Sequence, residues 1–244
     1  MIAHLLYKQS SVKPVVFFFW LLFTLSPNIA LTMEQTGNCH CFRDRVFNPA
    51  NRFQADNYLL TTVGNSLIAS HFSISKRRIV MMKMQGGTGN NDLLIGLYLS
   101  SISGSDVKDI LTAKEKTSWQ GTVANDSTLK TMHNDEILGL LKQGETEEKI
   151  AGHIMQKMLQ KRFDVSGEIL LSLHQSGLSP RETALVLTLA EYTGVPPKSI
   201  TAQNKTKGLS WSEIANNFGL EPAEVGKLVL GLAPTLSETI DEHR

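Results

Sequence analysis

The most constraining feature of this sequence is a helix start that recurs in its C-terminal half. The pattern Gly-Leu-Ser-x-x-Glu-x-Ala occurs at residues 177–184 and 208–215, and a looser version occupies residues 144–151. In such a start, glycine ends one helix, serine caps the next, and a glutamate three residues later can close a capping box. The capping residues predicted in this way are Ser179, Glu182, Ser210 and Glu213.

The spacing of apolar residues predicts an all-α fold. Beyond Ala55 these residues recur with a period near 3.6, and no stretch alternates long enough to indicate a strand. A second frame, an apolar residue, a turn and an apolar residue five positions on, follows at 165–170, 195–200 and 220–225. We therefore expect consecutive αα-hairpins, about six irregular units of roughly 30 residues, in a solenoid-like array or a helical bundle.

The N-terminus has the pattern of a secretory signal peptide. Its first residues include two lysines and no acid, an unbroken apolar run covers residues 15–25, and Pro27 follows. A membrane-spanning helix needs roughly 20 apolar residues, about twice the length of this run. We expect a signal peptide over residues 1–32, cleaved after Ala30 or Thr32, with a retained N-terminal anchor as the alternative.

This prediction sets the domain organisation and the localisation. We divide the chain into the signal peptide, an N-terminal arm over residues 33–55 and a helical domain over residues 56–244. An exported protein, periplasmic or secreted, would meet a membrane only through an uncleaved N-terminus. The chain has 24 Lys and Arg against 23 Asp and Glu. That balance argues against a nucleic-acid-binding surface, so the expected partner is another protein or a second copy of the chain.

The arm contains the densest group of metal-ligating residue types, Cys39, His40 and Cys41. Thiolate and imidazole suit zinc or copper, but this group supplies at most three ligands and the chain has no other cysteines. Cys39 and Cys41 could instead close a tight disulfide, pair with another chain, or have no role. A thiol-redox or metal-handling protein is therefore the alternative hypothesis, while the leading expectation is that no cofactor is bound.

Residues 209–225 resemble a helix-turn-helix DNA-reading unit. The positions that carry the resemblance are Ala215, Gly219, Leu220 and Val225. The second helix of this segment contains Glu221 and Glu224 but no Arg, Asn or Gln to pair with a base edge. We interpret the segment as another αα-corner. A membrane-tethered regulator, which requires an uncleaved N-terminus, is the third hypothesis.

Three other groups are given ordinary structural interpretations. The basic run at residues 76–78, with Lys83, is expected to form a solvated face, and the methionines beside it to fill the core. The aromatic residues of the arm are expected to pack into the protein's own first hairpin. The histidines of the helices are expected to be single and without a catalytic partner. The methionines are Met81, Met82 and Met84, the aromatic residues are Phe42, Phe47 and Phe53, and the histidines are His71, His153 and His174.

No recognised catalytic motif accompanies the helices. The sequence has no Gly-x-Ser-x-Gly elbow, phosphate loop or His-Glu-x-x-His helix. A site assembled from distant residues would escape such a scan, but an enzyme is the less favoured reading. The sequence therefore predicts an exported, non-enzymatic α-helical protein that acts as a protein-binding or assembly module.

Overall fold

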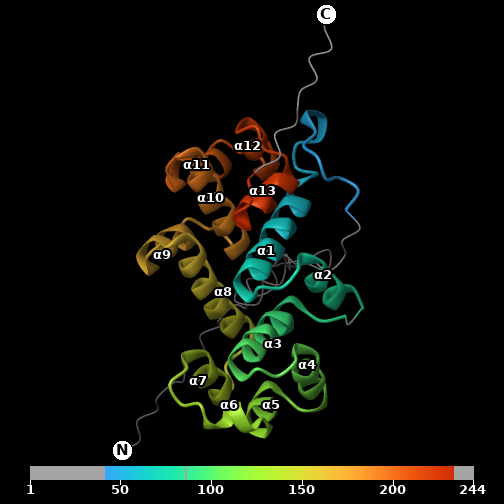
Figure 1. Cartoon of the computed structure of the whole chain (residues 1–244). Coiled ribbons are helices and arrows are strands. Elements are labelled where there is room, and N and C mark those ends of the chain that lie inside the picture. Colours follow the sequence, from blue (N-terminus) through green and yellow to red (C-terminus); the bar gives the residue numbers. More distant parts are fainter. Residues whose placement is uncertain (1–41, 86, 234–244) are drawn as a thin grey trace, which may run out of the picture. The chain divides into compact units, whose positions relative to one another are not determined.

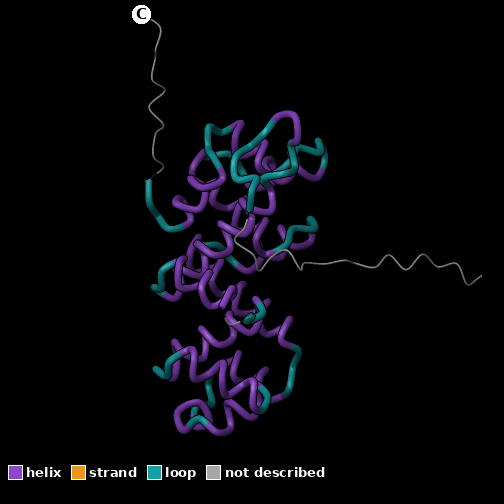
Figure 2. Tube along the Cα trace, turned by 90° about the vertical axis from the view of Figure 1, so that its right-hand side faces the viewer, coloured by secondary structure: helices purple, strands orange, loops and turns teal. Residues whose placement is uncertain are grey.

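The computed structural model describes residues 42–85 and 87–233, all of which fall in one compact unit. Over these ranges the protein is all-α, with 13 α-helices, a short 3-10 helix and no strand (Figure 2). The elements are η2 (Pro49–Asn51), α1 (Asp56–Phe72), α2 (Lys76–Gln85), α3 (Asn90–Ser103), α4 (Val107–Lys116), α5 (Trp119–Asn125), α6 (Ser127–Thr131), α7 (Glu136–Gln143), α8 (Glu147–Phe163), α9 (Gly167–Gln175), α10 (Pro180–Thr193), α11 (Pro197–Lys205), α12 (Trp211–Asn217) and α13 (Pro222–Val229). None of these helices is long and apolar enough to cross a membrane.

The recurring helix starts have the local geometry that their chemistry dictates. The Ser179 hydroxyl accepts the Glu182 N–H, and the Glu182 carboxylate accepts the Ser179 N–H in return. Ser210 and Glu213 form the same box at the start of α12. The glycine two residues before each serine has a positive φ, which glycine adopts without steric cost. Local sequence alone therefore explains where α10 and α12 begin.

Helix α1 is the element on which the described helices converge. It packs against α2 and α3, which follow it in the chain, and also against α8, α10, α12 and α13 (Figure 1). In a strict solenoid each unit contacts only its neighbours. Here α13, at the C-terminal end of the described chain, packs along α1, so distant segments are joined.

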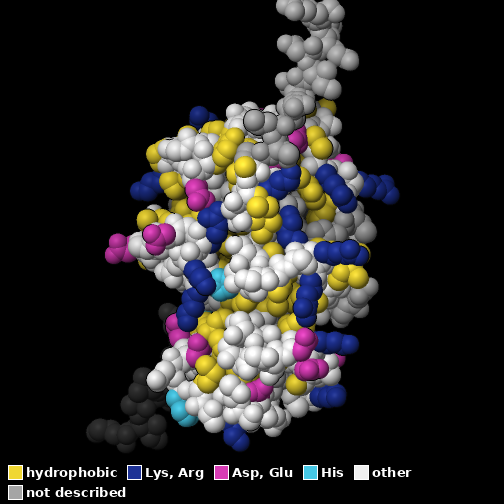
Figure 3. Space-filling model, in the orientation of Figure 1, with side chains coloured by type: hydrophobic (Ala, Val, Ile, Leu, Met, Phe, Trp, Pro, Cys, Tyr) yellow, Lys and Arg dark blue, Asp and Glu magenta, His cyan; other side chains and the backbone are white. Residues whose placement is uncertain are grey.

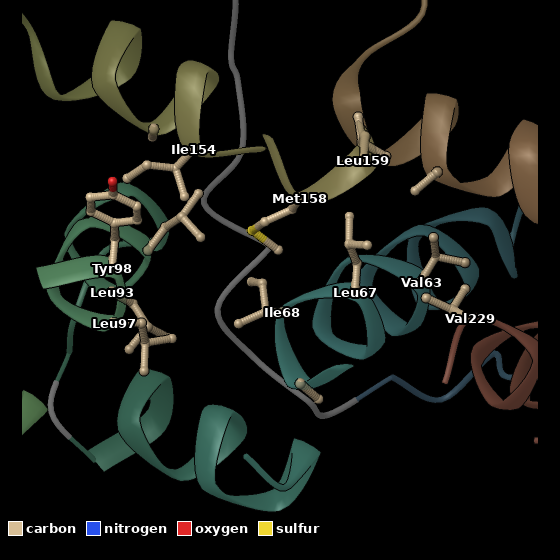
Figure 4. Close-up of a cluster of buried hydrophobic side chains, with 14 of the residues drawn as sticks. Val63, Leu67, Ile68, Leu93, Leu97, Tyr98, Ile154, Met158, Leu159 and Val229 are labelled. Carbon is tan, nitrogen blue, oxygen red and sulfur yellow. The ribbon is translucent and has the colours of Figure 1, made fainter. Parts of the chain in front are cut away.

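The hydrophobic core lies where α1, α3 and α8 meet. Figure 4 shows side chains from these helices and from α13 pointing toward one another. The labelled residues are Val63, Leu67, Ile68, Leu93, Leu97, Tyr98, Ile154, Met158, Leu159 and Val229. These residues belong to a single cluster of buried side chains, to which every α-helix from α1 to α13 contributes. Burial of this apolar surface is the main stabilising contribution to the fold.

A glycine permits the close packing of α13 on α1. A Cβ atom at Gly226 would lie 2.4 Å from Thr62 Cγ2, far inside normal contact distance. The end of α13 is held by Arg162 of α8, whose guanidinium donates to the carbonyls of Leu228 and Val229 at 2.9 and 2.8 Å. The Leu228 carbonyl also accepts the Gly231 N–H at 2.9 Å, so the arginine adds side-chain hydrogen bonds to the backbone bonds of this helix end.

Helix α2 corrects the prediction of a solvated basic face. The Lys83 side chain is buried, with 5% of its surface exposed, whereas Met81 and Met84 are exposed. The inward face of α2 is set by its packing on α1, where the Lys83 amine finds Asn65 Oδ1 at 2.8 Å. The inward face of α2 thus contains the apolar Ile79 and a lysine with a polar partner on α1, which composition alone could not show.

The aromatic residues of the arm differ in burial. The Phe42 ring packs edge-on against Tyr58 of α1, with the ring centres 5.7 Å apart. Phe53, expected to pack inside, is an exposed side chain with the Arg52 guanidinium over its ring. The arm is therefore attached to α1 at Phe42 and only partly buried.

Candidate functional site

The residues predicted to bind a metal or form a disulfide lie outside the described part of the chain. Cys39, His40 and Cys41, like the predicted signal peptide, precede residue 42. Within residues 42–85 and 87–233 no group of three His, Cys, Asp or Glu side chains could hold a metal ion. The thiol and metal hypothesis therefore stays a prediction from the sequence.

The helix-turn-helix segment is a packing corner in this structure. Helices α12 and α13 are joined through Gly219, whose φ is +75°. A DNA-reading helix must expose one face to enter the major groove. Helix α13 packs Val225, Gly226 and Val229 inward, and its main neighbour is α1. The hypothesis of a membrane-tethered regulator stays a prediction from the sequence.

A carboxylate from α1 holds the start of α12. Asp56 accepts the backbone N–H groups of Trp211 at 3.1 Å and Ser212 at 2.8 Å, and the Ser212 hydroxyl lies 2.7 Å from the same carboxylate. Burial raises the pKa of Asp56 although these hydrogen bonds act to lower it. Asp56 therefore caps the start of α12 from a neighbouring helix, together with the Ser212 hydroxyl.

A second carboxylate connects two of the recurring helix starts. Glu182, which closes the capping box of α10, also accepts the indole N–H of Trp211 at 2.9 Å. Burial would raise the pKa of Glu182, but hydrogen bonds from Ser179 and Trp211 and the charge of Lys205 outweigh it and lower the pKa. The predicted capping residues therefore act as a structural link between α10 and α12.

Helix α9 differs from the capped starts of α10 and α12, because its exposed surface includes apolar side chains. Leu170 and Leu173 face the core, while Ile169 and Leu171 are 44% and 56% exposed. Successive helix positions differ by about 100°, so Ile169 and Leu171 lie on either side of the buried Leu170. We call the exposed pair Ile169 and Leu171 the α9 ridge. Figure 1 shows α9 at the left margin of the view.

An apolar hollow of about 310 Å³ lies on one side of the α9 ridge. Its floor is formed by Leu159, Leu170 and Leu178, all nearly fully buried. We call it the first hollow. Its complete lining, from α8, α9 and the start of α10, is Lys149, Gly152, His153, Gln156, Leu159, Leu170, Leu171, His174, Leu178, Pro180 and Thr183.

A second hollow, of about 450 Å³, lies on the other side of α9. It is formed by α9 and by the loop that leads into α11. Its lining residues are Glu168, Ile169, Ser172, Leu173, Pro196, Pro197 and Lys198. Leu171 lines the first hollow and Ile169 the second. The two residues of the α9 ridge therefore lie on opposite flanks of the helix, each beside its own hollow.

Polar groups also surround the first hollow. Lys149 pairs with Glu145 at 2.7 Å, and His153 lies 3.6 Å from Glu136. His174 lines the same hollow as His153. Sequence analysis treated these histidines as unrelated, and only the packing of α9 on α8 brings them to one place. The run Ile-Leu-Leu in α9 does not by itself reveal the exposed pair, because α3 buries the comparable run Leu93, Leu94 and Ile95.

Comparisons with protein-family models, with curated proteins and with solved structures found no match to this chain. Its function must therefore be inferred from its own side chains.

Proposed function

We propose that this chain is an exported, non-enzymatic helical module that assembles with a second copy of itself through α9. The observation that carries the proposal is the α9 ridge, an exposed apolar pair between two apolar hollows. Exposed apolar side chains that adjoin apolar hollows favour an interaction site more than isolated exposed side chains do.

The shape of this surface favours a second copy over an unrelated partner. A two-fold interface uses the same patch on both subunits, so that patch must contain a protrusion and a matching recess. Here Leu171 protrudes beside the first hollow, whose floor is made of leucines. In a symmetric dimer, the ridge of each copy would enter a hollow of the other, as helix ridges pack into grooves.

The charges around α9 are also compatible with self-association. Glu168 lies in the first turn of α9, whereas Lys149, His153 and His174 border the first hollow. A self-complementary patch needs both signs of charge, because each copy must supply the partner for the other. Such rim pairs would orient the two copies, while the apolar residues would supply most of the free energy.

Sedimentation velocity over a wide range of protein concentration tests this proposal. We expect the wild-type chain to associate into dimers and Leu171→Glu to remain monomeric, because a buried unpaired carboxylate is strongly unfavourable. Val46→Glu is a matched control, since Val46 is 58% exposed but belongs to the arm. A wild-type chain that stays monomeric at the highest concentration, or equal loss of association in Val46→Glu, would overturn the proposal. A monomer that binds a different protein through Leu171 would assign the ridge to that partner instead.

The hairpin organisation is part of the same proposal. The recurring helix start, a glycine followed two residues later by serine or threonine, begins α8, α10 and α12. The N-cap residues of these helices are Thr146, Ser179 and Ser210. We propose that α7 to α13 are irregular hairpin units, closed into a bundle by the packing of α13 on α1. Export rests on the sequence of residues 1–32. It is tested by the intact mass of the exported protein, which should begin near Leu31 or Met33.

The alternative function is tested separately. If the chain acts through Cys39, His40 and Cys41, replacing both cysteines by serine should abolish metal uptake or thiol exchange and leave helicity unchanged. Equal metal binding and reactivity in that double variant would exclude the alternative.

A further inference from the structure

The first hollow has a lining of one charge sign. Among the described residues that form it there is no Asp or Glu, and its floor consists of three leucines that are at most 6% exposed. Small-molecule sites combine such an apolar cavity with a few polar groups that fix the orientation of the ligand. The polar side chains of this lining, from α8, α9 and α10, are Lys149, His153, Gln156, His174 and Thr183.

Three of these side chains keep hydrogen-bond donors that the protein itself does not use. The Lys149 ammonium has three donors and forms one exposed ion pair, with Glu145 at 2.7 Å. The Nδ1 atom of His153 lies 3.6 Å from Glu136, which leaves the other ring nitrogen unused. The His174 side chain forms no hydrogen bond or ion pair with another described residue. An anionic group in the hollow would therefore meet several donors.

The first hollow also has room for a ligand. Its volume of about 310 Å³ is near the lower end of small-molecule pockets, roughly 300–1,000 Å³. A water-sized group takes about 30 Å³, so the hollow holds roughly ten groups of the size of a methylene. Gly152 of α8 keeps part of the lining open, because a Cβ atom there would meet no atom within 4 Å beyond its own helix. The hollow therefore suits a short alkyl chain with one polar end.

We infer that the first hollow binds a medium-chain carboxylate, with its alkyl chain on the leucine floor and its carboxylate among the polar side chains. The ammonium of Lys149 and an imidazole N–H can donate to the carboxylate oxygens, and such charge-assisted hydrogen bonds are the strong ones. In Figure 3, Lys and Arg side chains lie beside apolar ones in the region of α8. Such a mixed surface matches an anionic amphiphile, whereas a cationic head group would be repelled by Lys149.

The effect of this ligand on assembly rests on the proposed function. Leu171 lines the first hollow, and in the symmetric dimer Leu171 of a second copy would enter it. An alkyl chain and that leucine cannot occupy the hollow together. The carboxylate is therefore expected to compete with dimer formation.

Equilibrium dialysis against straight-chain carboxylates tests the site, at protein concentrations low enough to keep the chain monomeric. From hexanoate to nonanoate, each added methylene should tighten binding by about fourfold, through burial of apolar surface. Nonanoate should bind about tenfold more tightly than nonanol or nonyltrimethylammonium, which have the same chain. An absence of nonanoate binding at millimolar concentration, or equal binding of the three head groups, would overturn the site.

Two glycines provide a matched pair of variants. Gly152→Leu should fill the hollow and weaken nonanoate binding at least tenfold, and folding is not at risk because leucine is the better helix former. Gly139→Leu, in α7, is the control, since a Cβ there also meets no atom within 4 Å and the residue lies outside the hollow. It should leave binding unchanged. Full binding by Gly152→Leu, or equal losses in the two variants, would contradict the inference.

A lysine variant tests the contact with the carboxylate. Lys149→Gln should weaken nonanoate binding about fivefold and leave nonanol binding unchanged, because only the charged ligand loses a charge-assisted hydrogen bond. Lys207→Gln, which removes an exposed charge after α11, should change neither. Equal weakening of nonanoate and nonanol by Lys149→Gln, or an equal effect of Lys207→Gln, would contradict the assigned contact.

Sedimentation velocity with and without saturating nonanoate separates this inference from the proposed function. We expect nonanoate to shift the wild-type chain from dimer to monomer. Dimers that persist with nonanoate bound would overturn the competition and leave the proposed assembly in place. A wild-type chain that is monomeric in both conditions would overturn the proposed function alone, since dialysis still decides the carboxylate site.

Discussion

Helices α2 and α9 are similar in length, with 10 and 9 residues, but they bury opposite kinds of side chain. Helix α2 turns Lys83 inward and leaves two methionines exposed, while α9 leaves Ile169 and Leu171 exposed. Both arrangements cost stability, since a solvated lysine and a buried leucine are the favourable states. The comparison teaches that helices of this fold depart from simple burial in both directions, and that α9 does so beside two hollows.

The largest expected effect contrasts a core leucine with a ridge leucine. Leu67 of α1 is 1% exposed and lies in the cluster of Figure 4. Leu67→Ala should lower the free energy of unfolding by about 3–4 kcal/mol, through lost burial and the cavity left behind. Leu171→Ala should change it by less than about 0.5 kcal/mol. Urea unfolding of both variants at low protein concentration measures the difference. Equal losses would mean that Leu171 supports the fold and would weaken its assignment to binding.

Lys83→Met should stabilise the chain at neutral pH. Burial lowers the pKa of Lys83 to about 8 from its ordinary 10.5, so the folded protein binds this proton less tightly than the unfolded chain. The variant removes that penalty but also the donor to Asn65, and a net gain of about 2 kcal/mol is expected.

The pH dependence of this gain follows from the direction of the shift. Below pH 8 the amine is protonated in both states and the penalty is complete. Between pH 8 and 10.5 the folded protein loses the proton first, so wild-type stability rises with pH. The advantage of Lys83→Met should therefore shrink as pH rises, as denaturant unfolding at each pH would show. An advantage that is constant from pH 7 to 10 would contradict the buried-ammonium account.

A smaller effect is expected at the link between α10 and α12. Glu182→Gln keeps the shape of the side chain but removes its charge from the Ser179 N–H and the Trp211 indole. The free energy of unfolding of the variant should be about 1 kcal/mol lower than that of the wild type at neutral pH. Because the pKa of Glu182 is lowered in the folded state, its contribution is present above pH 4.5 and is lost as pH falls further. Denaturant unfolding at each pH should show that the stabilities of the wild type and the variant converge in acid. A difference in stability that persists at pH 2 would assign the loss to packing.

Local parts of this structure could be predicted from the sequence, whereas tertiary contacts could not. The helix starts at Ser179 and Ser210 depend on residues three positions apart, so the chain itself contains the required partners. The burial of Lys83 depends on Asn65, eighteen residues earlier, and on how α2 packs over α1. The meeting of His153 and His174 likewise depends on the packing of α9 on α8. Helical periodicity predicts which elements form, but partners on different helices are chosen only when the whole chain packs.

The measurement that tests the central claim most directly is amide hydrogen exchange of α9 and α1 as a function of protein concentration. Amides of α1 are enclosed within each subunit, so their protection should not change with concentration. Amides of α9 should become more protected as concentration rises, and Leu171→Glu should remove that rise without altering α1. Protection of α9 that is independent of concentration, in a protein whose α1 is fully protected, would contradict assembly through the α9 ridge.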